Sequence, residues 1–414
     1  MTAAAPPRLG DAHWLARPET QAVFAALTAQ GFAVRAVGGA VRNALIGRAV
    51  VDVDFATPAT PDQVIAAAKA AGLEAVPTGI AHGTVTVISS RVPFEVTTLR
   101  RDVETFGRHA TVAFTGDWAE DARRRDFTMN ALYCDAAGQV FDPIGGYADV
   151  AARRVRFIAS PTERIREDYL RILRFFRLNA EFGEGPADAE GLAACVRERS
   201  GIARLSAERV RQELLRLLVA PRAVDVVHTM LEHGLLPLVL GAAPRPNLLG
   251  RLARLEAALG CAPDAILRLA ALAAETPDDA DQLRARLRLS NDEHDRLARA
   301  AGPSPDLGPA TPDPASRAYL YAEGADAYRA RVLTGWARSG ERPDNADWRA
   351  RLTLPERWSA PRFPLTGADV MALGIPAGPR VGEMLRALEA WWIAGDFAAN
   401  EAALRAELAQ RART

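Results

Sequence analysis

The chain has 414 residues, of which 49% are hydrophobic and 25% are charged, and its 51 Lys and Arg residues balance 51 Asp and Glu residues. This composition predicts a globular protein of two to four domains and excludes a disordered chain, a coil or a fibre. The neutral total excludes a uniformly basic protein but not a basic surface on one domain. Residues 151–216 form such a stretch, because 14 basic against 10 acidic side chains give +4.

Two further counts narrow the class of protein. Lys69 is the single lysine, which excludes a Walker A phosphate loop. The three cysteines, at positions 134, 195 and 261, have neither the spacing of a zinc or redox motif nor that of a disulfide framework. We therefore expect a reducing, cytoplasmic location, and the lack of a long apolar run predicts a protein with no membrane span.

Along the chain, short segments rich in Val and Thr alternate with helical periodicity up to about residue 150. The expected strands are 32–37, 51–55, 83–88 and 93–99, and the expected helices are 20–30, 40–46 and 61–71. From about residue 160 the periodicity is helical throughout, and five prolines between 303 and 314 mark a loop or a domain boundary. The sequence thus predicts an α/β or α+β unit followed by an all-helical array.

The segment 51–55 carries two acids in alternation. In a strand, Asp52 and Asp54 would share one face while Val51, Val53 and Phe55 share the other. Two adjacent carboxylates repel each other, so a hard cation such as Mg²⁺ is the expected partner. A solvated edge strand is the alternative interpretation of this motif taken alone.

A Gly-Gly-x-x-Arg motif, residues 38–42, ends ten residues before Asp52 and stands between an expected strand and an expected helix. The amides that follow Gly38 and Gly39 can approach a phosphate, and Arg42 on the first helical turn can add a charge-assisted contact. An ordinary turn would explain the glycines by themselves. Their place beside an Asp pair instead favours a phosphate cradle next to a metal site.

Glu95 supplies a third acid if the strand at 93–99 pairs beside 51–55. Three carboxylates that hold Mg²⁺ suit phosphoryl or nucleotidyl transfer, because two metal ions activate an attacking hydroxyl and neutralise a leaving pyrophosphate. The alternative for Glu95 is a structural ion pair with Arg100 or Arg101.

Six segments then match a known family in its own order. They are VGGAVRN (37–43), DVD (52–54), RRDFTMNA (124–131), DPIGG (142–146), ERIREDYLRILR (163–174) and LSAERVRQEL (205–214). Over residues 32 to about 216 the chain resembles the class II tRNA nucleotidyltransferases, which are the CCA-adding enzymes and their bacterial poly(A) polymerase relatives. Asn43 departs from the Asp that many members carry there.

The resemblance implies a nucleotidyltransferase head of polymerase-beta type with a mixed sheet, followed by helical neck, body and tail domains. The corresponding ranges are 1–150 for the head, 151–216 for the neck, 217–301 for the body, 302–315 for a Pro-rich linker and 316–414 for a tail with possible tRNA binding. It also implies that Arg125, Asp126 and Asn130 hold the ribose and phosphate of the nucleotide. Bidentate guanidinium and carboxylate groups suit that task.

Residues 163–180 read as one amphipathic helix. Glu167, Asp168, Arg171 and Arg174 fall on one arc, and apolar side chains occupy the facing arc. Asp168 offers acceptors and Arg171 offers donors, which complement the Watson–Crick edges of cytosine and adenine. The resemblance implies that this pair selects CTP and ATP; ordinary surface ion pairs are the alternative.

The resulting hypothesis is an enzyme that adds CMP, CMP and AMP to the 3′ end of tRNA without a nucleic-acid template. Asp52 and Asp54 would hold Mg²⁺, and Glu95 would assist as a third ligand or as a base. A poly(A) polymerase, or an enzyme that adds only CC or only A, is the nearest alternative. A non-catalytic RNA-binding relative is the alternative of a different class.

Overall fold

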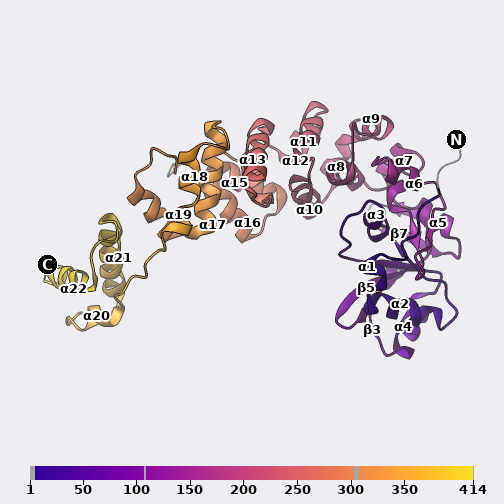
Figure 1. Ribbon diagram of the computed structural model, residues 1–414, viewed down its shortest axis with the longest axis horizontal. Coiled ribbons are helices and arrows are strands. Elements are labelled where there is room, and N and C mark those ends of the chain that lie inside the picture. The colour runs from indigo at the N-terminus through magenta and orange to yellow at the C-terminus, as the bar shows by residue number, and fades with distance from the viewer. Residues whose placement is uncertain (1–4, 107–108, 303–306, 414) are drawn as a thin grey trace. The chain divides into compact units, whose positions relative to one another are not determined.

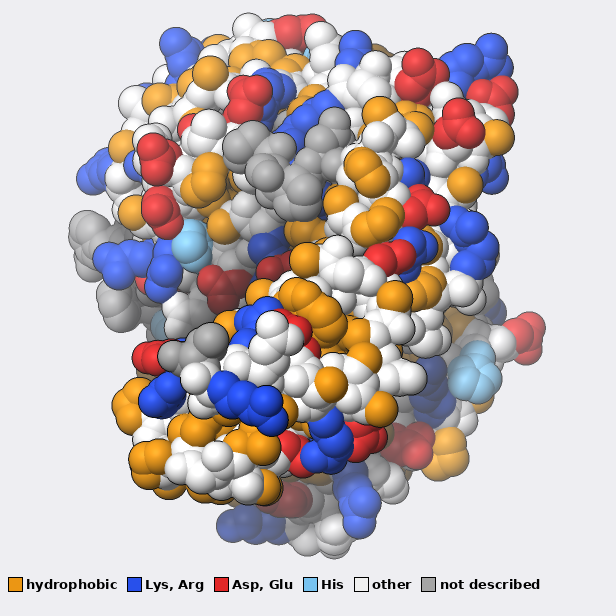
Figure 2. Space-filling model, turned by 90° about the vertical axis from the view of Figure 1, so that its left-hand side faces the viewer, with side chains coloured by type: hydrophobic (Ala, Val, Ile, Leu, Met, Phe, Trp, Pro, Cys, Tyr) orange, Lys and Arg blue, Asp and Glu red, His pale blue; other side chains and the backbone are white. Residues whose placement is uncertain are grey.

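The computed structural model describes residues 5–106, 109–302 and 307–413, and between 102 and 112 it describes the backbone only. The chain forms two compact units, residues up to Val239 and residues from Leu240 onward, which are treated separately below (Figure 1). In the described part of the chain, no helix is both long and apolar enough to cross a membrane. Basic and acidic side chains lie interspersed on the face drawn in Figure 2, as the zero net charge leads one to expect.

The first unit is built on a mixed seven-stranded sheet with the strand order β3-β4-β5-β2-β1-β8-β9. Only β2 and β5 pair in parallel; the other neighbours are antiparallel. A separate two-stranded ribbon is formed by β6 and β7. The strands are β1 Arg35–Val37, β2 Asp54–Thr57, β3 Glu74–Gly79, β4 Thr84–Ser89, β5 Val92–Thr98, β6 Arg100–Phe106, β7 His109–Phe114, β8 Tyr133–Cys134 and β9 Val140–Phe141.

The core of this sheet lies under α2 (Pro18–Thr28) and α4 (Pro61–Ala70), which pack on strands β3 and β4. Phe55 in the centre of the sheet is fully buried and meets Phe24 of α2 edge to face, with ring centroids 4.9 Å apart. A capping box of Thr60 and Gln63 fixes the start of α4 directly after β2. Asp54, the first residue of β2, has an exposed side chain that lies outside this core.

Among the remaining helices of the first unit, several of which lie between strands of the sheet, α8 packs on α10 and α11. These remaining helices are α1 His13–Ala16, α3 Gly39–Leu45, η1 Ile80–His82, α5 Trp118–Arg123, η2 Thr128–Asn130, α6 Tyr147–Ala151, α7 Pro161–Glu167, α8 Leu170–Phe182, α9 Ala189–Arg197, η3 Arg199–Arg204, α10 Ala207–Leu218, α11 Ala223–Glu232 and α12 Leu236–Leu240. Ile172, Phe175 and Phe176 bury the apolar face of α8.

The second unit is helical in its described residues. Its helices are α13 Pro246–Leu259, α14 Ala265–Ala273, α15 Pro277–Leu287, α16 Asn291–Ala301, α17 Asp313–Ser339, α18 Ala346–Leu352, α19 Leu354–Arg357, α20 Gly367–Met371, α21 Pro379–Ala394 and α22 Glu401–Ala412. Leu388, Trp392 and Leu404 centre a small apolar cluster among the last three helices. The longest helix, α17, is interrupted at Gly324, where φ is +81°.

The predicted α+β head with helices after it is confirmed, and the four expected strands and three expected helices are found with shifted ends. Sequence reasoning missed β3 and the two-residue strands β8 and β9. No strand was predicted in residues 100–114, where the described backbone forms the β6–β7 ribbon; Gly107 and Arg108 lie outside the described residues. The strand expected over 51–55 begins only at Asp54, so Val51 lies before it and does not share a strand face with Phe55; Val51 is 79% exposed.

Candidate active site

The glycine turn between β1 and α3 has the geometry expected of a cradle. Gly38 adopts φ +72° and ψ −120°, a backbone conformation that is unfavourable for residues with a Cβ atom. A Cβ built there would lie 3.7 Å from Nη1 of Arg125. The turn therefore brings main chain close to a guanidinium that comes from a distant part of the sequence.

Arg42 of α3 is a buried cation, 8% exposed, with neutral hydrogen-bond acceptors. Its Nε and Nη2 donate to Oδ1 of Asn43 at 3.2 and 2.9 Å, and its Nη1 donates to Oδ1 of Asn130. The guanidinium also stacks on the ring of Phe182, 3.8 Å from its centroid. Burial lowers the pKa of Arg42 to about 10, and Glu181 opposes this only in part. The amide of Asn43 orients the guanidinium without neutralising its charge.

The three predicted carboxylates lie near one another where the interior strands β2 and β5 pair, and we call Asp52, Asp54 and Glu95 the carboxylate edge. Strand β2 runs parallel to β5 with Phe55 opposite Val96, so Asp54 and Glu95 occupy aligned positions one residue earlier. The predicted pairing of these strands is thus confirmed. Asp52 lies in the segment just before β2, not within the strand.

The carboxylate edge carries negative charge that Arg125 offsets only in part. The side chain of Asp54 reaches solvent, yet the surrounding protein removes enough water to raise its pKa, and Glu95 and Asp52 raise it further, to about 6, against the opposing effect of Arg125. In the described part of the chain, no three His, Cys, Asp or Glu side chains lie close enough together to hold a metal ion, so the carboxylate edge is not a formed metal site. The donor chemistry fits Mg²⁺, since carboxylate oxygens are its preferred protein ligands and a cation would relieve the repulsion at Asp54.

Asp121 of α5 organises the arginines beside the cradle, and sequence reasoning did not single it out. Its fully buried carboxylate accepts from Arg124 at 2.8 Å, from Arg125 at 3.0 Å and from the Tyr133 hydroxyl at 2.7 Å. Burial alone would raise the pKa of Asp121, but Arg125 and Arg124 outweigh it and hold that pKa below its ordinary value. The spacing of Asp121 and Arg125 by four residues was the available signal.

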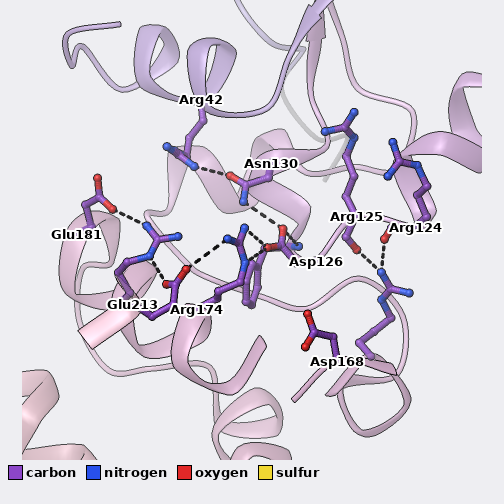
Figure 3. A network of polar contacts seen from close by, with 12 residues as sticks. Arg42, Arg124, Arg125, Asp126, Asn130, Asp168, Arg174, Glu181 and Glu213 are labelled. Atoms are coloured by element: carbon purple, nitrogen blue, oxygen red, sulfur yellow. Dashed lines mark hydrogen bonds and ion pairs between the residues drawn. The ribbon is translucent and has the colours of Figure 1, made fainter. Parts of the chain in front are cut away.

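A second set of ion pairs connects the turn after α5 to helices α8 and α10 (Figure 3), and we call Asp126, Arg174, Glu213, Arg177 and Glu181 the ion-pair network. Arg174 contacts Oδ2 of Asp126 at 2.5 Å and Oε1 of Glu213 at 3.6 Å. Arg177 continues the network to Glu213 at 2.5 Å and to Glu181 at 2.9 Å.

The network fixes the charge of Asp126, whose Oδ1 also accepts from Asn130 at 3.2 Å. Burial would raise the pKa of Asp126, but Arg174 and its hydrogen bonds lower it to about 2. The predicted trio of Arg125, Asp126 and Asn130 is therefore brought together in the folded chain. Glu213 contacts Arg174, the partner of Asp126, and Arg177 contacts Glu213. The part of these two residues in the network was not predicted.

The prediction of one continuous helix over 163–180 is wrong. Helix α7 ends at Glu167, Asp168 has extended backbone with φ −152° and ψ 108°, and α8 starts at Leu170. The main-chain amide of Leu170 donates to Oδ1 of Asp168 at 3.1 Å, a local bond that competes with helical geometry.

Each of the two groups expected to face a base is held by another side chain. Arg209 of α10 binds the Asp168 carboxylate through both oxygens, at 3.2 and 2.6 Å. Arg171 donates to Glu167 and, at 2.6 Å, to the carbonyl oxygen of Arg164. The break thus presents an orientated acceptor and an orientated donor side by side.

These pieces line one cleft of about 590 Å³, a size in the range of ligand pockets. It contains every predicted nucleotide-binding residue except Glu167, and of the carboxylate edge it contains only Asp54. The lining residues are Gly38, Gly39, Arg42, Asp54, Arg124, Arg125, Asp126, Asn130, Asp168, Leu170, Arg171, Arg174, Arg177, Leu178, Glu181, Arg209 and Arg216. Together the fold and this cleft define a nucleotidyltransferase.

Comparisons with known proteins agree with this class. A family model described as the poly A polymerase head domain matches residues 34–156, and one described as the probable RNA and SrmB-binding site of polymerase A matches residues 188–245. The mouse protein named CCA tRNA nucleotidyltransferase 1, mitochondrial, is 36% identical over 87% of this chain and 82% of its own length. The CCA-adding enzyme of Geobacillus thermodenitrificans is 36% identical over 55% of each chain.

A solved structure is similar over nearly the whole chain. The Bacillus stearothermophilus CCA-adding enzyme in complex with CTP superposes with a TM-score of 0.70 at 28% identity, covering 96% of this chain and 98% of that one. The chain belongs to the CCA tRNA nucleotidyltransferase family.

Proposed function

We propose that this enzyme adds CMP, CMP and AMP in turn to the 3′ end of tRNA, releasing pyrophosphate at each step, with no nucleic-acid template. The observation that carries the proposal is the single cleft that joins the glycine cradle with Arg42, the Asp54 carboxylate and the Asp168–Arg171 pair. These are the three contacts that a nucleoside triphosphate needs: one for phosphate, one for the reacting centre and one for the base.

The Asp168–Arg171 pair supports a choice of cytosine and adenine. Both bases present an exocyclic amine that donates and a ring nitrogen that accepts, so a carboxylate beside a guanidinium complements them. Uracil and guanine present the reverse pattern, an oxygen that accepts and a ring N–H that donates. Facing Asp168 and Arg171, they would leave two desolvated polar groups without partners, which is costly.

Arg42 and the trio of Arg125, Asp126 and Asn130 support the triphosphate and sugar contacts. Arg42 is a buried guanidinium hydrogen-bonded to two neutral amide oxygens, so a phosphate would supply a directly bound anion, which neither amide provides. Asp126, with its pKa near 2, remains a carboxylate acceptor for a ribose hydroxyl at all physiological pH values.

The carboxylate edge would hold the metal, with Asp52 and Asp54 as ligands and Glu95 as a third ligand or as a base. Bound Mg²⁺ would supply activation of the attacking hydroxyl and neutralisation of the pyrophosphate. The chain's own contribution is to aim Asp54 into the cleft while Arg125, held by Asp121, stands across from it. The tRNA 3′ hydroxyl would enter beside Asp54 and attack the α-phosphate.

The tRNA partner and the cellular location are part of the same proposal. The basic stretch at 151–216 and the matched RNA-binding segment at 188–245 support tRNA as the partner. The free cysteines Cys134, Cys195 and Cys261 suit a reducing compartment, for which we propose the cytoplasm. The mouse relative is named as mitochondrial, so fractionation of the cells that make this protein is the test.

The activity is tested by incubating the protein and Mg²⁺ with a tRNA that lacks its last three nucleotides. The four nucleoside triphosphates are supplied singly and together, and products are sized at single-nucleotide resolution. We expect two additions with CTP alone and an end after three with CTP and ATP. A long adenylate ladder would instead identify a poly(A) polymerase, and no extension would identify a non-catalytic relative.

A further inference from the structure

Arg164 is a buried arginine of α7, 7% exposed, that contacts two elements of the first unit at once. Its Nη1 donates to the Glu167 carboxylate one turn later in the same helix. Its Nη2 donates to the carbonyl oxygens of Arg124 and Arg125, the latter at 2.8 Å. The guanidinium thus joins the break at Asp168 to the turn that carries Arg125 and Asp126.

The main-chain end of this contact has a clear physical cause. Helix α5 ends at Arg123 with Arg124 as its C-cap, so the carbonyls of Arg124 and Arg125 lie at the negative end of the helix. A buried guanidinium satisfies both carbonyls and offsets the desolvation of its own charge. Because both acceptors are backbone atoms, the contact fixes the main chain of the turn that bears Arg125.

The other end of the contact leads to Arg171. The same Glu167 oxygen accepts from Arg164 and from Arg171, and Nη1 of Arg171 also donates to the Arg164 carbonyl at 2.6 Å. The side chains of Arg164 and Arg171 therefore meet at one Glu167 oxygen, and the main-chain carbonyl of Arg164 closes the group. Asp168, by contrast, is orientated by Arg209 from α10, at 2.6 Å, and by the main-chain amide of Leu170.

We propose that Arg164 is a positioning residue for base selection, which holds Arg171 in register with the Arg125–Asp126 turn through Glu167. The inference rests on the proposed function, because it assigns the donor half of base recognition to this group. Arg164 itself touches no substrate. The structure divides the two halves: loss of the Arg164 side chain removes the contact that anchors Glu167, and with it the fixed position of the donor Arg171, while Arg209 still orientates the acceptor Asp168.

The test uses ATP analogues and a tRNA that ends in CC. In 1-deaza-ATP the ring nitrogen that would accept from Arg171 is a C–H group, and purine riboside triphosphate lacks the amine that would donate to Asp168. We expect the wild-type protein to show a penalty in kcat/KM of roughly tenfold or more for each analogue against ATP. In Arg164→Met the penalty for 1-deaza-ATP should fall to near one, whereas the penalty for purine riboside triphosphate should persist.

Matched variants keep the result interpretable. Arg166→Met removes an exposed arginine of the same helix, paired with Glu198, and should keep both penalties. Glu167→Gln breaks the same group without changing its size, so it should repeat the loss for 1-deaza-ATP and serves if Arg164→Met does not fold. Arg164→Lys should restore little of the 1-deaza-ATP penalty. An ammonium group cannot donate to the Glu167 carboxylate and to the two main-chain carbonyls in the planar geometry that a guanidinium allows.

Two outcomes would overturn the inference: an unchanged 1-deaza-ATP penalty in Arg164→Met, or an equal loss of both penalties, which would mean that the variant merely loosens the neck. Failure of the wild-type protein to add AMP to the CC end would contradict the proposed function instead, so the two failures are distinguishable.

Discussion

The two walls of the cleft are built on opposite electrostatic principles. The carboxylate edge is exposed and repulsive, and the pKa of Asp54 is raised to about 6. In the ion-pair network every acid faces arginine, and the pKa of Asp126 is lowered to about 2. The first wall is therefore suited to recruit a cation, and the second is organised in advance to hold a nucleotide. The predictions below follow from this difference.

The largest effect is expected at the carboxylate edge. Asp54→Asn should lower nucleotide addition on the order of a thousandfold or more, because it removes a ligand of the proposed metal site. Binding of tRNA, measured by filter retention, should be unchanged. Asp62→Asn alters an exposed Asp of α4 and is the matched control. Substantial turnover by Asp54→Asn would rule out the metal role.

On the opposite wall, Asp168→Ala should change selectivity more than rate. Without the acceptor, discrimination of CTP against UTP should fall about ten- to hundredfold, in line with the loss of one charged hydrogen bond. Competition between the two nucleotides at a tRNA end that lacks CCA measures the ratio. Asp225→Ala, at an exposed position of α11, should leave it unaltered. Retained selectivity in Asp168→Ala would place base recognition elsewhere.

The ion-pair network should also affect folding stability. Because the folded-state pKa of Asp126 lies below its unfolded value, its contribution is present above about pH 4 and is lost as pH falls toward 2. Denaturant unfolding of wild type and Asp126→Asn should therefore differ by about 2 kcal/mol at neutral pH and converge near pH 2. A difference that does not depend on pH would show that the ion pair with Arg174 is not its cause.

The smallest effect should be metal-linked stability. Mg²⁺ should raise the melting temperature of the wild-type protein by a few degrees at pH 7.5 and by less at pH 5, where Asp54 is largely protonated. Asp54→Asn should respond less than wild type at pH 7.5. An equal response of both proteins would indicate that the ion binds elsewhere.

The same contrast explains what the sequence could predict. The carboxylate edge and the glycine turn depend on local spacing and strand alternation, so Asp54, Glu95 and Gly38 could be grouped before the fold was known. The partners of the second wall could not, because Arg209 lies 41 residues from Asp168 and Glu213 lies 36 from Arg177. The break at Asp168 was also hidden, since neither Gly nor Pro marks it and the apolar periodicity continues through it.

The most direct test of the account is a crystal structure of this protein with CTP and Mg²⁺. We expect the cytosine amine to lie within hydrogen-bond distance of the Asp168 carboxylate and Arg171 to donate to the base. We also expect the triphosphate at the Gly38–Gly39 turn beside Arg42. A base bound away from Asp168 and Arg171, or a triphosphate bound outside the cleft, would contradict the account.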